Sequence, residues 1–248
     1  MKLYVNPNSD ASRFVQNIIS QVGLEYQFFI VDLSSMEQRS GDYLKMNPKG
    51  KVPVLQDGDY VLSESFAIAR YAIDKQIQIQ SLKLQGHFIY GNQRWKHENI
   101  LQRCQQLYPT NPKERAVIDM YAGIINELRI NMISLFYGRV VLPSRGITTP
   151  EVTLKQYEMN MHKLWQEFEG YFSDTERKYL CGGSNDTLVD WFLCQLIVDH
   201  DALQIDHITR YPNTFKFAVN MTQKYPSLAD GYDRYNRQVL EYSQRQKL

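Results

Sequence analysis

Residues 47–65, NPKGKVPVLQDGDYVLSES, carry the clearest structural pattern in the chain. The opening Asn-Pro-Lys-Gly predicts a tight turn, because these residue types favour turn geometry. An Asp-Gly pair then lies between two apolar runs, residues 52–55 and 60–62, and this arrangement is a strong β-hairpin signal. We therefore expect two antiparallel strands here, followed by a helix after Ser63.

Upstream of this stretch, the hydrophobic pattern alternates between strand and helix periods. Residues 2–5 and 26–31 are rich in β-branched and aromatic side chains, so both predict strands. Between them, residues 12–22 place apolar side chains at helical spacing and end at a glycine. A short helix at 41–46 and a longer one at 64–75 complete the order β-α-β-α-β-β-α. This order predicts a small α/β domain with one mixed sheet.

From residue 84 on, strand patterns nearly vanish and helical periodicity dominates. The polar tract at residues 76–83 separates the two patterns and predicts a linker. We therefore expect an α/β domain over residues 1–76 and an all-helical domain over residues 84–248. The expected helices cover residues 84–107, 113–138, 153–172, 187–199 and 212–225.

Composition excludes several classes of protein. The 248 residues include 28 Lys and Arg against 27 Asp and Glu, so the formal charge of +1 argues against a general nucleic-acid binder. No stretch approaches the roughly 20 apolar residues of a membrane span, and the start turns polar by residue 6, unlike a signal peptide. The five histidines lack metal-site spacing, so no metal is expected. Three widely spaced cysteines suit reduced thiols in a cytoplasmic protein.

Three polar segments could serve either the fold or a ligand. In residues 6–11, Ser9 could cap a helix or donate a hydrogen bond to an anion. Pro53 opens a strand, where proline is commonly structural. In residues 62–65, the serines could cap the next helix, and Glu64 suits the positive end of the helix dipole. Each segment alone has a structural explanation, so only their order and spacing together indicate function.

That order and spacing resemble the glutathione transferase family. The resemblance rests on Ser9-x-x-x-Arg13 after a strand, on Asn47-Pro48-x-Gly50-Lys51-Val52-Pro53-Val54-Leu55, on Asp57-Gly58 and on Ser63-Glu64-Ser65. In the helical half, Thr187-Leu188-Val189-Asp190 resembles the family's capping box, and Trp95-Lys96-His97 resembles the theta class. The resemblance implies a thioredoxin-like domain with a mixed four-stranded sheet, followed by a helical bundle, in a homodimer.

The resemblance also implies which residues bind glutathione. Pro53 would be a cis proline that turns the backbone of Val52 toward the cysteinyl part of the ligand. Glu64 would take the ammonium of the γ-glutamyl group, while Ser65 and the helix N-terminus would take the adjacent carboxylate. The residues expected at the glycine carboxylate are Lys51 and Gln38.

Ser9 is the catalytic residue that the resemblance implies. It lies four residues before Arg13, as in the serine-using, theta-like classes, whereas Tyr4 lies inside a strand and is expected to pack. No cysteine occurs before Cys104, which disfavours the cysteine-using classes. A thiol with a pKa of ~8.5 is only about 7% ionised near pH 7.4, and a hydroxyl hydrogen bond favours the thiolate. The thiolate would attack an electrophile held in an apolar pocket of the helical domain.

The sequence departs from the family pattern at three positions. Ala11 stands where proline is common, Ser12 where theta-like relatives often carry cysteine, and Gln38 where histidine is frequent. Ser12 is close enough to Ser9 to be a substitute donor, and Arg13 is a secondary candidate. The expected activity is transfer of glutathione, the co-substrate, to small electrophiles such as halides or epoxides. The alternatives are a non-catalytic glutathione-binding or carrier protein and a scaffold domain that no longer binds glutathione.

Overall fold

The strands and helices expected in the first 75 residues are present in the computed structural model, which describes residues 1–85, 92–200 and 207–228. A short 3-10 helix, η1 (Glu37–Arg39), is an addition that the hydrophobic pattern did not predict. The other elements are β1 (Lys2–Val5), α1 (Asp10–Val22), β2 (Gln27–Ile30), α2 (Gly41–Met46), β3 (Val54–Asp57), β4 (Tyr60–Ser63) and α3 (Ser65–Gln85).

The four strands form one mixed sheet in the order β2-β1-β3-β4. β1 pairs parallel to β2 and antiparallel to β3, and β3 pairs antiparallel to β4. In this register Tyr4 lies opposite Val54, and Val54 lies opposite Ser63. The carboxyl end of β1, the amino end of β3 and the carboxyl end of β4 therefore lie at the same end of the sheet.

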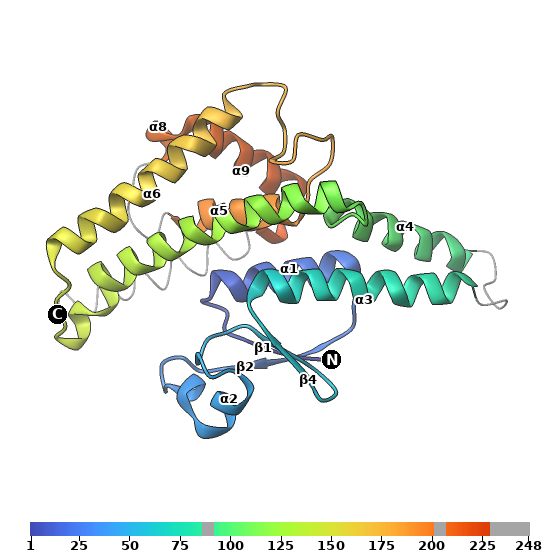
Figure 1. Cartoon of the computed structure of the whole chain (residues 1–248), viewed down its shortest axis with the longest axis horizontal. Helices are drawn as coiled ribbons and strands as arrows, with labels where there is room; N and C mark the ends of the chain where they lie inside the picture. Colours follow the sequence, from blue (N-terminus) through green and yellow to red (C-terminus); the bar gives the residue numbers. More distant parts are fainter. Residues whose placement is uncertain (86–91, 201–206, 229–248) are drawn as a thin grey trace. The chain divides into compact units, whose positions relative to one another are not determined.

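The two faces of the sheet are covered by different helices (Figure 1). α1 and α3 cover one face, over the fully buried side chains of Leu3 and Leu55. On the other face, a cluster of Val31, Tyr43 and Val54 joins the sheet to α2. Because successive side chains of a strand alternate between faces, neighbouring residues of β1 and β3 serve both layers.

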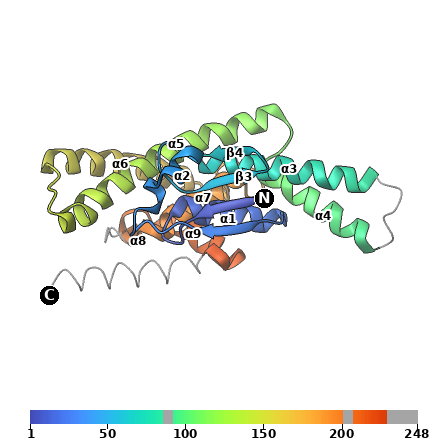
Figure 2. The ribbon, with the colours of Figure 1, turned by 90° about the horizontal axis from the view of Figure 1, so that it is seen from below.

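The predicted linker at residues 76–83 is wrong, because α3 continues through it to Gln85. Gln76 and Gln80 are almost completely buried, so the tract is polar without being solvated. The Gln76 amide donates to the carbonyl of Val22, 2.8 Å away, at the end of α1, and Gln80 Oε1 lies 2.5 Å from His97 Nδ1. α3 packs beside α4 (Asn92–Leu107), as Figures 1 and 2 show.

The chain separates into two compact units, Met1–Arg115 and Ala116–Leu248, so α3 and α4 belong to the first unit. This boundary differs from the one expected between residues 76 and 84. Of the expected helix 84–107, residues 86–91 lie outside the described part of the chain, and residues 84 and 85 belong to α3.

The regular elements of the second unit are all helices among its described residues, as predicted, and α7 is its most buried helix. α6 and α7 both pack against α9. No described helix of the chain is both long enough and apolar enough to cross a membrane. The helices of this part of the chain are α5 (Pro112–Phe136), the π-helical turn η2 (Tyr137–Val141), the 3-10 turn η3 (Pro143–Arg145), α6 (Glu151–Phe172), α7 (Leu188–His200), α8 (His207–Arg210) and α9 (Pro212–Lys224).

At the start of α7, the expected contact from the Asp190 carboxylate back to the cap residue Thr187 is confirmed. Asp190 Oδ2 accepts hydrogen bonds from the Thr187 amide at 2.7 Å and from the Thr187 hydroxyl at 2.9 Å. Its other oxygen accepts from the Leu180 amide at 2.8 Å. Asp190 is fully buried, and this burial raises the pKa of its carboxyl to about 6.

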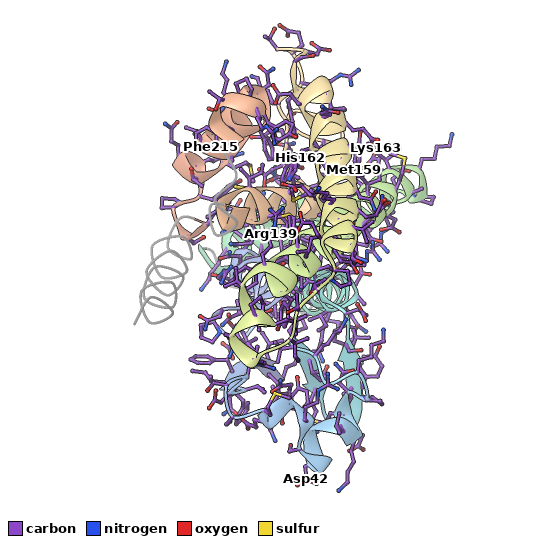
Figure 3. All side chains as sticks on the ribbon, turned by 90° about the vertical axis from the view of Figure 1, so that its left-hand side faces the viewer. Asp42, Arg139, Met159, His162, Lys163 and Phe215 are labelled. Atoms are coloured by element: carbon purple, nitrogen blue, oxygen red, sulfur yellow. The ribbon has the colours of Figure 1, made fainter. Side chains whose placement is uncertain are left out.

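Polar contacts tie α6 to neighbouring elements of the second unit; Figure 3 labels two of the residues involved, Arg139 and His162. Arg139 forms an ion pair with Glu158 at 2.7 Å. His162 Nδ1 lies 2.7 Å from the Tyr211 hydroxyl, and the Arg210 guanidinium lies 2.9 Å from His162 Nε2. Burial, reinforced by Arg210, lowers the pKa of His162, so the ring is neutral and Nε2 accepts from Arg210.

Candidate functional site

Three of the predicted segments meet at one end of the sheet in the first unit. Residues 6–9 follow β1, residues 52–53 precede β3, and residues 64–65 follow β4. The Val52–Pro53 peptide bond is cis, as the resemblance implies. The Val52 side chain packs against the Val31–Tyr43–Val54 cluster, which fixes where its backbone lies.

The loop between β1 and α1 is held by hydrogen bonds from both sides. The side chain of Asn6 donates from Nδ2 to the Val31 carbonyl at 2.8 Å, and its Oδ1 accepts from the Asn8 backbone amide at 2.9 Å. Arg13, in α1, donates to the Pro7 carbonyl at 2.7 Å. The structure therefore gives Arg13, a secondary site candidate, a contact that shapes this loop.

Ser9 is the N-cap of α1, and its residue is half-buried. Its Oγ accepts a hydrogen bond from the Ser12 amide at 3.3 Å, which is the capping role that competed with a functional one in the sequence. A hydroxyl accepts through its lone pairs and donates through its own hydrogen. Capping and donation to a thiolate are thus compatible, so the two interpretations of Ser9 do not exclude each other.

Ser12 has a different environment, because it is completely buried in the first turn of α1. Its Oγ accepts a hydrogen bond from the backbone amide of Asn6 at 3.2 Å and so stabilises the same loop. Of the two serines, only Ser9 is partly exposed.

The turn at residues 47–51 is organised by two side chains that the sequence did not single out as functional. The buried Asn47 donates from Nδ2 to the Lys51 carbonyl at 2.7 Å and accepts the Lys49 amide on Oδ1 at 3.1 Å. The Tyr43 hydroxyl, from α2, donates to the same carbonyl at 2.9 Å. Burial raises the pKa of Tyr43, which keeps it a donor. Together they fix the peptide that leads into Val52.

Gly50 allows this turn to pack closely against η1. Its φ is +58°, and a Cβ atom there would lie 2.8 Å from the Gln38 carbonyl oxygen. Any residue with a side chain would therefore push η1 and the turn apart. This contact places the Gln38 carbonyl next to Gly50, which directly precedes the exposed Lys51 in the chain; Gln38 and Lys51 are the two residues expected at the glycine carboxylate.

Glu64 adopts a strained backbone conformation between β4 and α3, with φ at +73°. Non-glycine residues with positive φ often lie at functional sites. Its carbonyl accepts from the Ile68 amide at 2.9 Å, so Glu64 also starts α3, of which Ser65 is the first residue. Its carboxylate forms an ion pair with Lys49 at 2.8 Å, which raises the pKa of that lysine. In the sequence, Lys49 is only part of a predicted turn.

Other candidate groups lie elsewhere. Tyr4 packs as predicted: its ring stacks on Phe29 with centroids 5.2 Å apart, and its hydroxyl donates to Gln56. All three cysteines are free thiols; Cys104 is completely buried and Cys181 partly so. Burial raises the pKa of Cys104 to about 12 and that of Cys181 to about 11.

Two cavities are lined by other residues. One of about 620 Å³ lies at the amino ends of β1 and β2, among Lys2, Tyr26 and Gln56. One of about 300 Å³ lies in the second unit, beside His162 and Tyr211. Neither contains any of the predicted glutathione contacts. Among the described residues, no group of three or more His, Cys, Asp or Glu side chains is arranged to hold a metal ion.

Residues 1–74 match the family described as "Glutathione S-transferase, N-terminal domain". Similarity to named transferases extends further along the chain. "Probable glutathione S-transferase GSTF1" of rice is 26% identical over 216 residues, covering 86% of this chain and 78% of the rice protein. "Glutathione S-transferase PARB" of tobacco is 27% identical over 191 residues, 77% of each chain.

Solved glutathione transferases share the fold of the whole chain. Human glutathione transferase theta-2 superposes with a TM-score of 0.77 at 20% identity, covering 98% of this chain and 90% of the human one. Glutathione transferase F2 of Populus trichocarpa superposes with a TM-score of 0.70 at 24% identity, covering 95% and 99%. The expected fold is thus confirmed: a thioredoxin-like domain with a mixed four-stranded sheet, followed by a helical part, as in these solved transferases.

Proposed function

We propose that this chain is a glutathione transferase of the serine type, which transfers glutathione to small electrophiles. The observation that carries the proposal is the meeting of three segments at one end of the sheet in a glutathione S-transferase N-terminal domain. These segments contain Ser9, the cis Val52–Pro53 peptide and the Glu64–Ser65 turn. The named transferase activity of the relatives supports the same function.

Ser9 would stabilise the glutathione thiolate without removing its proton. The Ser9 hydroxyl lies at the N-terminus of α1, where the helix dipole also favours a negative charge. A hydrogen bond from the hydroxyl to sulfur, added to the dipole, favours the ionised thiol. The thiolate then attacks an electrophilic carbon, forms a carbon–sulfur bond and displaces the leaving group or opens the epoxide ring.

The other residues would bind the two ends and the middle of the tripeptide. The backbone of Val52 would pair with the cysteinyl part, as an added strand pairs with a sheet edge. Glu64 would bind the γ-glutamyl ammonium, and Ser65 with the N-terminus of α3 would bind the adjacent carboxylate. Lys51 and Gln38 would bind the glycine carboxylate.

Finer aspects of the function are part of the same proposal. The Trp95-Lys96-His97 motif supports a theta-like class, for which halides and epoxides would be acceptors. The helical unit would line the electrophile pocket, and the protein would work as a cytoplasmic homodimer. Three free cysteines suit a reducing compartment.

Calorimetry with glutathione, followed by addition of a halide and an epoxide, tests the proposal on the full chain. Binding with conjugation supports a transferase, binding without conjugation favours the carrier alternative, and no binding contradicts both. Ser9→Ala should lose most conjugation while it keeps glutathione affinity within a few-fold. Ser9→Gly should lose the same activity but less stability, because glycine costs only a few tenths of a kcal/mol at an N-cap whereas alanine costs about 1 kcal/mol.

A further inference from the structure

The ion pair between Lys49 and Glu64 lies where the proposed binding mode needs a free carboxylate. Lys49 Nζ is 2.8 Å from Glu64 Oε1, although the two residues are 15 positions apart. Glu64 is the residue proposed to receive the ammonium group of glutathione. In the proposed binding mode, a side-chain ammonium of the protein therefore already contacts the carboxylate that would bind the ligand's ammonium.

Two well-defined turns hold the backbones of this pair. On one side, the Lys49 amide donates to Asn47 Oδ1, and the close packing of Gly50 against η1 fixes the turn. On the other side, Glu64 is held at φ +73° by the start of α3. The placement of the pair therefore follows from the backbone, and only the flexible lysine stem needs to move when a ligand binds.

The pair is also weak enough to be displaced. The side chains of Lys49 and Glu64 are 64% and 61% exposed, so water and salt screen their attraction. Exposed ion pairs change an equilibrium by no more than about five-fold. A competing ammonium can therefore replace Lys49 at a small cost in affinity.

We propose that Lys49 is a built-in substitute for the ammonium group of the ligand and lowers the selectivity of the site for that group. This inference rests on the proposed function. Glutathione must exchange one ion pair for another, so its ammonium adds little to binding. A thiol tripeptide without the amino group leaves the Lys49–Glu64 pair intact, so no carboxylate is left without a counterion. The site should therefore accept deaminated γ-glutamyl thiols almost as well as glutathione.

The test compares glutathione with its deaminated analogue, in which hydrogen replaces the γ-glutamyl amino group. Calorimetry at low salt gives both dissociation constants for the wild-type chain and for Lys49→Met. We expect the preference for glutathione to rise about two- to five-fold in Lys49→Met and to return toward the wild-type value at high salt. In the background of Glu64→Gln, Lys49→Met should no longer change the preference.

Lys45→Met is the matched control. Lys45 forms an exposed ion pair with Asp42 at the same 2.8 Å distance, on α2, where Figure 3 labels Asp42. The control removes the same charge from the same unit and should leave the preference unchanged. An equal rise in both variants would assign the effect to net charge and overturn the proposal.

Two other results would also overturn it. Weaker glutathione binding in Lys49→Met without a rise in preference would assign Lys49 to the ligand's carboxylate. Unchanged binding of both ligands would show that Lys49 plays no part in recognition. In both cases the wild-type chain still binds glutathione and the proposed function stands. Absence of glutathione binding to the wild-type chain would contradict the proposed function itself, and this inference with it.

Discussion

Asn47 shows how much of the candidate site depends on a single buried side chain. The residue is only 3% exposed, and its amide spans the turn from the Lys49 amide to the Lys51 carbonyl. From the sequence, Asn47 was only the first residue of a turn. Its second role, donation to the Lys51 carbonyl, depends on the path of the chain after Gly50. Local residue preferences do not predict that path.

Replacing Asn47 should therefore affect both stability and ligand binding. Asn47→Ala leaves the Lys49 amide without its side-chain acceptor and removes one of two donors to the Lys51 carbonyl. We expect the free energy of unfolding to fall by about 1–3 kcal/mol, together with weaker glutathione binding. Urea unfolding and calorimetry measure the two effects.

Asn47→Asp is the informative control. The aspartate keeps an acceptor for the Lys49 amide. Its second oxygen, however, replaces the Nδ2 group that donates to the Lys51 carbonyl in the wild type, so two acceptors face each other. It should destabilise the chain as well, despite its nearly identical shape. Wild-type stability in both variants would contradict the bridging role of Asn47.

The pH dependence of conjugation distinguishes the roles of the two serines at the start of α1, Ser9 and Ser12. Ser9→Ala should lower the rate near pH 7.4 on the order of ten-fold, as the thiol pKa returns toward ~8.5 from about two units below it. The loss should shrink as pH rises, since free thiol then ionises without help. A loss of the same size at every pH would contradict thiolate stabilisation by Ser9.

Ser12→Ala should behave in the opposite way. Because the Ser12 hydroxyl is buried and accepts from the Asn6 amide, its removal should cost about 1–3 kcal/mol of stability. The pH profile of conjugation should stay at its wild-type position. A profile shifted as in Ser9→Ala would return Ser12 to the catalytic role that the sequence left open.

Candidate residues could be selected from the sequence where they follow a motif, but not where they depend on a contact between distant residues. Ser9, Pro53 and Glu64 could be named from order and spacing. Lys49 could not, because its partner lies 15 residues away on another turn and the sequence around it indicates only a loop. An unassigned charge beside a motif is the sole signal that could have pointed to it.

Helix α7 shows a prediction that depends only on local sequence and holds. The resemblance of residues 187–190 to a capping box predicted a contact from Asp190 back to Thr187, and that contact is present. The pattern does not reveal that Asp190 is also a buried carboxylate that accepts from Leu180, ten residues upstream. That contact ties the preceding loop to the helix, so one acid supports two segments.

Asp190→Asn should destabilise the second unit. In the wild type, both oxygens of Asp190 accept hydrogen bonds from backbone N–H groups. The side-chain NH₂ of an asparagine is a donor, so it would face one of these N–H groups and leave it without an acceptor. We expect a loss of about 1–3 kcal/mol in the free energy of unfolding at pH 7, measured by urea unfolding.

The pH dependence of that loss is a second, independent check. Burial raises the folded-state pKa of Asp190 to about 6 from its usual 3.8. Between about pH 4 and pH 6 the folded state thus holds a proton that the unfolded state has released, so the Asp190 contribution to stability falls as pH rises. The difference between wild type and Asp190→Asn should be largest near pH 4 and constant above pH 7. A difference that does not vary with pH would contradict the raised pKa.

At the level of the entire chain, the strand and helix order was predictable but the boundary between the units was not. Polar composition at residues 76–83 suggested a solvated linker, whereas Gln76 and Gln80 are buried and bind α1 and α4. Composition shows which side chains are polar, but not whether groups of neighbouring helices form hydrogen bonds with them. The first unit accordingly extends to Arg115.

Hydrogen exchange of the full chain tests this organisation. If residues 76–83 belong to α3, their amides should exchange as slowly as those of residues 69–75 earlier in the same helix. An extended linker would exchange orders of magnitude faster. Mass spectrometry of peptides covering both segments compares them in one sample, and fast exchange confined to residues 76–83 would restore the linker.

The buried, weakly acidic thiols of the chain have a practical consequence for assays. Thiolate is the form that reacts with disulfide and maleimide reagents, and Cys104 and Cys181, with pKa values of about 12 and 11, hold almost none of it near neutral pH. Cys194 is completely buried. A colorimetric thiol reagent added to a reaction should therefore report glutathione consumption with little background from the enzyme, and one cysteine engineered on the surface should accept a fluorescent label selectively.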